Sequence, residues 1–194
     1  MKLLYIDACV RAQSRSKILA DYLLTGLCAQ TTCTTTEVIL PQLNLQPLNE
    51  QTLQHRTSMI AQNHFDDAMF ALAKDFAAAD LIVIVAPYWD LSFPSLLKLY
   101  IEHINVAKLV FRYGADGRPV SLCRAQKLCY ITTKGGYNPD DFGYDYIKYL
   151  AHNFYQIPSV HLIKAEGLDI IGNDVDAILQ QTKSEIDALI TSLI

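Results

Sequence analysis

The sequence predicts an α/β protein in which helices cover both faces of a five-stranded, doubly wound parallel sheet. Short apolar stretches alternate five times with longer segments of helical periodicity, as in parallel sheets built with right-handed crossovers. The stretch Leu81 to Ala86 has six apolar residues in a row, which is typical of a central strand buried on both faces. Pro87 ends this strand, because proline has no N–H to donate. Five such strands fit the order 2-1-3-4-5.

The expected strands share an apolar or β-branched composition and are bounded by polar residues, glycine or proline. They cover residues 2–6, 34–40, 81–86, 127–132 and 160–164. The expected helices carry apolar residues three and four positions apart. They cover residues 14–29, 51–79 (continuous or interrupted), 94–104, 144–155 and 173 to the end, with Asn173 as the cap of the last. Residues 108–124 form a longer connection with a turn signal at 116–119.

Composition excludes several classes of protein. The 194 residues suit a single domain, 1–194, and the net charge of −4 argues against nucleic acid as a partner. No apolar run approaches the ~18 residues of a membrane span, and the N-terminus lacks the features of a signal peptide. Five cysteines without a Cys-x-x-Cys pair, and histidines without an HExxH spacing, predict reduced thiols and no metal site. We expect a cytoplasmic protein with no membrane partner.

Three loops with unusual chemistry follow the first, third and fourth strands, so a parallel sheet would bring them to one edge. The first ends in Ser14-Arg15-Ser16 at a helix start, where free N–H groups and the helix dipole favour an anion. The second, Tyr88 to Leu91, offers two aromatic rings to a flat ligand. The third, Thr133 to Gly136, contains paired glycines that allow backbone N–H groups close to a ligand.

Each loop also has an ordinary interpretation. Ser14 could be a simple N-cap, the two aromatics could be partly buried loop residues, and the glycines could form a plain turn. Neither GxGxxG nor a Walker GxxxxGK[ST] motif occurs. Taken together, the loops indicate a ligand with one terminal phosphate and a planar aromatic body, a description that flavin mononucleotide (FMN) fits.

The anchors of these loops, in their order and spacing, resemble a known family. They are Cys9 to Ser16, Pro87 to Leu91, Phe111-Arg112-Tyr113, Thr132 to Gly136 and Ala165-Glu166-Gly167. The chain resembles, over essentially its whole length, the flavodoxin-like FMN-dependent NAD(P)H oxidoreductases of the azoreductase and quinone-reductase family. The resemblance implies a tightly bound FMN, NAD(P)H as hydride donor, and a flat quinone, azo compound or similar aromatic small molecule as acceptor.

The resemblance also implies roles for particular residues. Ser14, Arg15 and Ser16 would hold the phosphate, with Cys9 nearby. The residues that would contact the flavin ring are Pro87, Tyr88, Trp89, Asp90, Leu91, Thr133, Lys134, Gly135 and Gly136. Two residues depart from the family pattern: Cys9 stands where serine is frequent, and Asp90 where asparagine is usual. Lys134 would add positive charge near the ring.

Family members are homodimers with flavin sites at the subunit interface. Phe111 and Tyr113 would then lie over the flavin, where nicotinamide and acceptor stack in turn, with packing of Phe111 on its own subunit as the alternative. Tyr113 is the candidate proton donor. The implied reaction is ping-pong: NAD(P)H reduces the flavin and leaves before the acceptor binds.

Two other functions occur on the same topology. A flavodoxin-type electron carrier remains the alternative, since it would bind FMN without turning over NAD(P)H. A signalling receiver domain on the same topology would need an Asp at the end of the third strand, where this chain has Ala86-Pro87.

Overall fold

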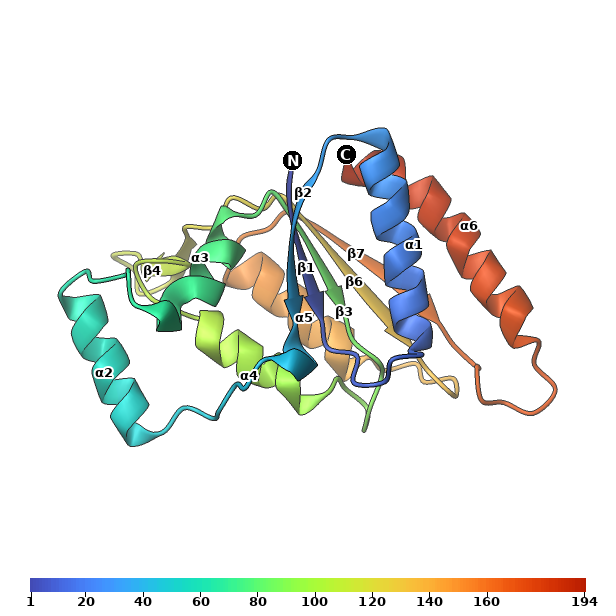
Figure 1. The fold of residues 1–194 in the computed structure, drawn as a ribbon, viewed down its shortest axis with the longest axis horizontal. Coiled ribbons are helices and arrows are strands. Elements are labelled where there is room, and N and C mark those ends of the chain that lie inside the picture. The colour runs from blue at the N-terminus through green and yellow to red at the C-terminus, as the bar shows by residue number, and fades with distance from the viewer.

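A computed structural model describes all residues, 1–194, and its centre is a parallel sheet in the order β2-β1-β3-β6-β7 (Figure 1). The strands are β1 (Lys2–Asp7), β2 (Thr34–Ile39), β3 (Leu81–Val85), β6 (Lys127–Thr133) and β7 (Ser159–Ala165). The predicted order 2-1-3-4-5 is confirmed. The connection at 108–124 contains a feature that the sequence did not predict, a two-stranded antiparallel hairpin of β4 (Phe111–Tyr113) and β5 (Pro119–Ser121).

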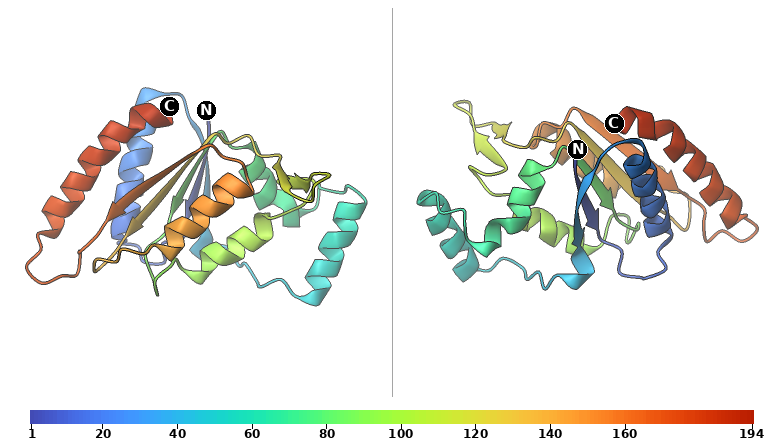
Figure 2. Two further views of the ribbon diagram at one scale, coloured as in Figure 1. Left: turned by 180° about the vertical axis from the view of Figure 1, so that it is seen from behind. Right: turned by 45° about the horizontal axis from the view of Figure 1, so that its top comes forward.

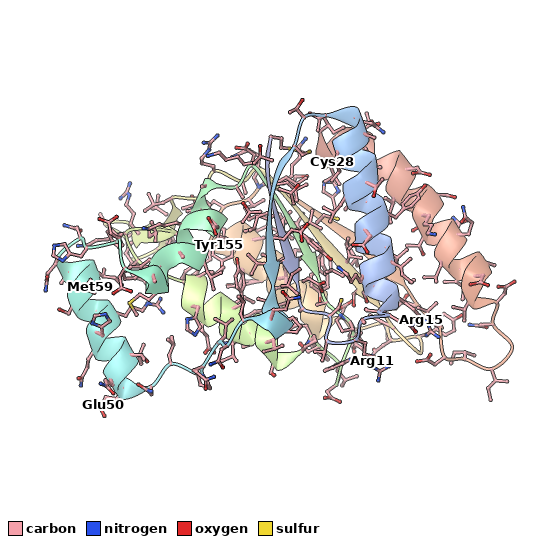
Figure 3. The ribbon with its side chains drawn as sticks, viewed as in Figure 1. Arg11, Arg15, Cys28, Glu50, Met59 and Tyr155 are labelled. Carbon is pink, nitrogen blue, oxygen red and sulfur yellow. The ribbon has the colours of Figure 1, made fainter.

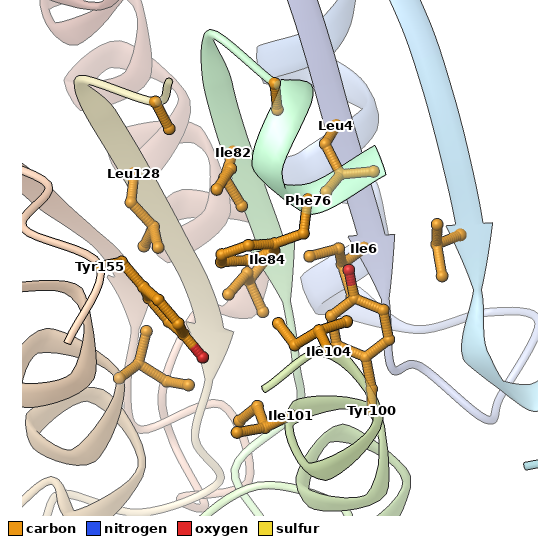
Figure 4. Close-up of a cluster of buried hydrophobic side chains, with 14 of the residues drawn as sticks. Leu4, Ile6, Phe76, Ile82, Ile84, Tyr100, Ile101, Ile104, Leu128 and Tyr155 are labelled. Atoms are coloured by element: carbon orange, nitrogen blue, oxygen red, sulfur yellow. The ribbon is translucent and has the colours of Figure 1, made fainter. Parts of the chain in front are cut away.

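Helices cover both faces of the sheet (Figures 1 and 2). One face carries α1 (Arg15–Gln30) and α6 (Val175–Leu193), and the other carries α3 (Ala71–Ala78), α4 (Ser95–Ile104) and α5 (Phe142–Asn153). A separate apolar cluster fills the space on each side, and Figure 4 shows the cluster beneath α3, α4 and α5. The sheet therefore lies between two cores and is itself inaccessible to water at its centre.

The middle strand β3 shows why its sequence is apolar without alternation. It pairs with β1 on one side and β6 on the other, and all five of its residues are buried. Because successive side chains of a strand point to opposite faces, Ile82 and Ile84 join one cluster while Leu81, Val83 and Val85 join the other. The uninterrupted run of β-branched and leucine side chains thus supplies both cores at once.

The helical segment predicted over 51–79 is interrupted. It forms α2 (Glu50–Ala61), a 3₁₀ turn η2 (Ala68–Phe70) and α3, and a further 3₁₀ turn, η1 (Leu40–Gln42), follows β2. Beyond α2 the backbone of Asn63 adopts a left-handed conformation with φ of 56°, which a continuous helix does not allow. The Asp67 side chain then accepts a hydrogen bond from the Met69 N–H and starts the next turn.

Helix α2 projects from the body of the molecule in all three views (Figures 1 and 2) and contains no fully buried residue. Its main polar anchor is Arg56, whose guanidinium donates to the carbonyl oxygens of Glu102 and Asn105 at the C-terminal end of α4. Orphan carbonyls at a helix end favour a cation there. Met59 and Ile60, which pack against the core, and Lys108, which donates to the Ile60 carbonyl, also connect α2 to the rest of the fold.

Two helix starts differ from the prediction. Helix α5 begins at Phe142, two residues early, because the Asp141 side chain accepts from the Tyr144 N–H and caps it. Helix α6 is capped by Asp174, which accepts from the Ala177 N–H, and the prediction of Asn173 as its cap is wrong. The Asn173 amide instead donates to the Gly167 carbonyl.

Considered for length and apolar content together, no helix of the chain meets the requirements of a membrane span.

Candidate cofactor site

A pocket of about 400 Å³ lies at the edge of the sheet where the strands have their carboxyl ends, the usual place for ligands in open α/β sheets. Figure 3 labels Arg11 and Arg15 in this region. The loops after β1, β3, β6 and β7 all contribute to it. Their lining residues are Val10, Arg11, Gln13, Ser14, Arg15, Pro87, Tyr88, Trp89, Thr133, Lys134, Gly135, Leu168 and Asp169. The three loops singled out from the sequence therefore share one pocket, and a fourth, after β7, joins them.

The loop after β1 presents backbone donors without partners. None of the five N–H groups from Val10 to Ser14 donates a hydrogen bond within the chain. Ser14 precedes α1, but its side chain makes no capping bond, and the first turn of α1 contains no acidic residue. The first N–H groups of any helix lack helical partners, so this end of the pocket is a concentrated set of donors.

Buried contacts hold that loop in place from behind. The Asp7 carboxylate, at the end of β1, accepts from the Cys9 N–H at 2.7 Å and from the Lys17 ammonium at 3.2 Å. The Ser16 side chain is fully buried, and its hydroxyl lies 2.8 Å from that of Thr133. The serine hydroxyl is therefore engaged between two loops, which leaves the Ser16 backbone N–H as the donor that it can offer a ligand.

Cys9 also lies behind the pocket and does not line it. Burial raises the pKa of its thiol to about 12, with the nearby Asp7 carboxylate acting in the same direction. At neutral pH the side chain is therefore a protonated thiol that packs against the core.

The loop after β3 forms a tight turn. The N–H and carbonyl groups of Trp89 and Ser92 exchange hydrogen bonds of 3.0 and 2.8 Å, and the two residues between them, Asp90 and Leu91, have φ of 48° and 66°. Two successive left-handed residues define a type I′ turn, which favours Asn, Asp or Gly. Asp90 suits this conformation, whereas Leu91 is strained in it. Neither of them lines the pocket, but the turn fixes Trp89, which does.

Tyr88 is held by contacts on its ring and on its hydroxyl. Its ring lies over the Lys134 ammonium, 4.4 Å from ring centroid to Nζ. The hydroxyl donates to the Asp140 carbonyl and accepts from the Asn138 amide. These contacts hold the Tyr88 ring by one face and by its hydroxyl, so the position of the ring is set before a ligand binds.

Lys134 does not place its charge in the pocket. Its side chain is 2% exposed, and Nζ lies 2.9 Å from an Asp141 carboxylate oxygen and 3.4 Å from one of Glu166. Burial alone would lower the pKa of this ammonium, but the ion pair with Asp141, assisted by Glu166, outweighs burial and raises it. The ammonium is therefore a structural cation that links the loops after β6 and β7 to the start of α5.

The glycine pair supplies a second set of donors. Neither Gly135 nor Gly136 donates its N–H to another group of the chain, while their carbonyls accept from Asp169 and Gly167. Gly135 lines the pocket, and an added Cβ there would collide with the Asp169 carboxylate. Gly167 has φ of +76° and lies against the Tyr137 hydroxyl, so a side chain would be excluded there for both reasons.

The loop after β7 brings a carboxylate into the pocket. The Arg15 guanidinium donates to Asp169 at 2.7 Å and to the Leu168 carbonyl at 3.3 Å. Both side chains of this ion pair remain largely open to water, at 41% and 71% exposed. Arg15, expected to meet an anionic ligand, thus meets an anion that belongs to the chain.

Phe111 and Tyr113 lie away from the pocket, on the β4–β5 hairpin at the opposite side of the molecule (Figures 1 and 3). Phe111 is 5% exposed and packs on Phe154 with ring centroids 4.5 Å apart, whereas Tyr113 is 61% exposed. Within one chain, therefore, neither residue reaches the predicted ligand.

Sequence reasoning did not single out five of the pocket residues: Val10, Arg11 and Gln13 after β1, and Leu168 and Asp169 after β7. Arg11 stands in the correct loop and makes no ion pair, so its charge could have been included with that of Arg15. For the two residues after β7, the rule that the carboxyl ends of parallel strands share an edge would have included their loop too.

The donors together define the kind of ligand that fits. The loop after β1 presents unpartnered amides and Arg11, the loop after β6 presents the glycine amides, and Tyr88 and Trp89 line the same pocket. A molecule with acceptor groups at both ends and a flat apolar middle would satisfy all of these features. No group of three or more His, Cys, Asp or Glu side chains is placed to hold a metal ion.

The comparison with known proteins agrees with this architecture. A family model described as "Flavodoxin-like fold" matches residues 1–190. The chain belongs to this flavodoxin-like family. A relative in Lachnoclostridium phytofermentans, an FMN-dependent NADH:quinone oxidoreductase, is 30% identical over 192 residues, a match that covers 95% of both chains.

A second relative is FMN-dependent NADH:quinone oxidoreductase 2 of Clostridium acetobutylicum, 39% identical over 123 residues. That match covers 60% of each protein, so here the chain spans under two thirds of the relative's length. Among solved structures, an FMN-dependent NADH-azoreductase from Bacillus anthracis in complex with FMN superposes with a TM-score of 0.83 at 22% identity, covering 99% of this chain and 98% of that one. At that identity the superposition establishes the flavodoxin-like fold.

Removing the buried ammonium tests its structural role. We expect Lys134→Met to lower the free energy of unfolding by about 3 kcal/mol at neutral pH, because Asp141 and Glu166 would lose a buried counter-charge. Lys164→Met is the matched control: Lys164 also pairs with Glu166, but it is 43% exposed and should contribute under about 1 kcal/mol. Urea unfolding measures both.

The stability difference between wild type and Lys134→Met should also depend on pH. The folded-state pKa of Lys134 is raised, so its contribution is complete below about pH 10.4, the unfolded value, and is lost as pH rises through the folded value. The stability gap between wild type and Lys134→Met should therefore stay constant from neutral pH up to about pH 10.4 and narrow above it, as pH rises through the raised folded-state pKa. A gap that stays constant or widens above that pH would contradict the assignment.

The strained turn gives a second prediction. Leu91→Gly should stabilise the protein by about 0.5–1 kcal/mol, because glycine adopts positive φ without the penalty of ~1–2 kcal/mol that other residues carry, less the entropy that it loses on folding. Leu91 is 53% exposed, so little burial is lost. Leu91→Ala, which keeps the strain, is the control and should not stabilise. The free energies of unfolding of wild type, Leu91→Gly and Leu91→Ala, measured with denaturant, test this prediction.

Proposed function

We propose that this protein binds FMN in the pocket and uses it to pass electrons from NADH to a flat aromatic acceptor such as a quinone or an azo compound. The observation that carries the proposal is that two loops with unpartnered N–H groups and two aromatic side chains border one pocket. FMN has a phosphate at one end, carbonyl oxygens at the other and a planar ring. The names of the relatives in Lachnoclostridium phytofermentans and Clostridium acetobutylicum support the same choice.

The phosphate end is assigned to the loop after β1. The N–H groups from Val10 onward, the start of α1, the Ser14 hydroxyl, and the guanidiniums of Arg11 and Arg15 would bind it. A phosphate monoester carries close to two negative charges at neutral pH, and backbone donors at a helix start are suited to it. Ser16 would contribute through its backbone, since its hydroxyl is shared with Thr133.

The ring end is assigned to the loops after β3 and β6. Pro87, Tyr88 and Trp89 would lie along the ring, and the N–H groups of Gly135 and Gly136 would donate to its carbonyl oxygens. Fixed backbone donors stabilise negative charge on such oxygens without reorganising. The bound FMN supplies the redox chemistry, and the chain supplies position and electrostatics.

NADH and the acceptor would use the same open face in turn, which makes the reaction ping-pong. We propose further that two chains associate and that the β4–β5 hairpin of one lies over the flavin of the other. This arrangement gives the exposed Tyr113 a position from which its hydroxyl can donate a proton to the acceptor. Phe111, buried against Phe154, would support the hairpin from its own subunit.

The test is reconstitution followed by turnover. Protein incubated with FMN and desalted should retain a yellow cofactor, oxidise NADH when a benzoquinone is added, and give parallel lines in double-reciprocal plots at several fixed quinone concentrations. NADPH in place of NADH, and an azo dye in place of the quinone, define the preferences. FMN binding with negligible NADH turnover would favour an electron carrier, and a protein that retains no FMN would contradict the proposal altogether.

The dimer has its own prediction. Sedimentation velocity of the FMN-loaded protein should give twice the 21.8 kDa chain mass. Tyr113→Phe should slow acceptor reduction at least about tenfold, as expected for a general acid, and leave the affinity for FMN unchanged. A monomer with full activity would remove the role given to the hairpin.

A further inference from the structure

The ion pair between Arg15 and Asp169 bears directly on how the pocket distinguishes its ligands. The Asp169 carboxylate takes up the cation that the proposed phosphate would need, 2.7 Å from the Arg15 guanidinium. It also lies over Gly135, where an added Cβ would collide with it. One side chain thus contacts both the cation of the loop after β1 and the first glycine of the loop after β6.

The backbone of Asp169 is held in place, whereas its side chain is free to move. The backbone is fixed, because the Asp169 N–H donates to the Gly135 carbonyl at 2.9 Å and the Leu168 N–H donates to the Lys134 carbonyl at 3.2 Å. The carboxylate is free, because it is 71% exposed and Arg15 is its only partner. The side chain can therefore rotate out of the pocket while the loop stays in place.

We propose that Asp169 is an internal competitor for the phosphate of the cofactor, and that it sets how strongly the pocket prefers a phosphorylated flavin. The inference rests on the proposed function. With no phosphate bound, the carboxylate neutralises Arg15. A phosphate monoester must displace it, and the two anions would otherwise repel each other across the guanidinium. Asp169 therefore weakens the binding of FMN and leaves riboflavin, which has no phosphate, nearly unaffected.

The expected size of the effect follows from the exposure of the pair. An exposed ion pair contributes little, so breaking it should cost a phosphorylated ligand about three- to tenfold in affinity. Asp169→Asn keeps the shape of the side chain and removes its charge. It should therefore tighten FMN binding about three- to tenfold and change riboflavin binding less than about twofold.

The experiment is a titration of FMN, and separately of riboflavin, with flavin-free protein at low salt, following the flavin fluorescence. The variants are Asp169→Asn and a matched control, Asp176→Asn, which makes the same charge change on an exposed residue that does not line the pocket. Circular dichroism confirms that each variant is folded. The control should bind both flavins as wild type does.

A double-mutant cycle separates displacement from simple repulsion. In an Arg15→Ala background there is no guanidinium to release, so Asp169→Asn should tighten FMN binding clearly less than it does in the wild type. An equal gain in both backgrounds would overturn the proposed competition. Weaker FMN binding by Asp169→Asn would also overturn it, because the carboxylate would then be holding Arg15 in position for the phosphate.

The remaining outcomes separate this inference from the proposed function. If FMN binds the wild type and Asp169→Asn equally well, the competition is wrong and the FMN site is unaffected. If neither flavin binds any variant, both the competition and the proposed function are contradicted.

Discussion

The structure depends on one geometric constraint: the strands β1, β3, β6 and β7 run in parallel and have their carboxyl ends at one edge. Loops that are far apart in sequence therefore meet in one pocket. The contact between Ser16 and Thr133, 117 residues apart, fixes two of these loops directly to each other. Backbone N–H groups at this edge have no partners in the chain, so the acceptor groups of a ligand can form hydrogen bonds with them.

The charges around the pocket fall into two groups with different roles. Lys134 and Asp141 are buried and Glu166 is partly buried, and their charges pair with one another, so they fix the loops and contribute little field to the pocket. Arg11, Arg15 and Asp169 face the pocket and remain accessible to water. Charges of the second group are available to a ligand because exposed ion pairs are weak and exchange partners at low cost. The sequence does not distinguish the structural charges from those available to a ligand, because the difference lies in how far each side chain is buried.

Much of the fold could be predicted because it depends on local patterns. The apolar run of β3 and the helical periodicity of α1 and α4 determine their structure within a few residues. The interruption after α2 and the β4–β5 hairpin were harder, since three-residue strands carry almost no periodic signal. The pocket loops were predicted from the same topology that the structure confirms.

The individual contacts within the pocket could not be predicted. Lys134 was expected to direct its charge at a ligand, yet tertiary partners bury it beneath Tyr88. The pairing of Arg15 with Asp169 joins residues 154 positions apart, and no spacing rule reaches that far. Such contacts depend on how loops of irregular conformation pack, and the sequence pattern does not specify that conformation.

The most direct measurement of the central claim is hydrogen–deuterium exchange with and without FMN. If four loops hold one cofactor, FMN should slow exchange in residues 8–17, 87–92, 133–136 and 165–169 together. Riboflavin should protect the second and third of these segments while leaving 8–17 close to its unbound rate. Protection confined to one loop, or lying outside this edge of the sheet, would contradict the account.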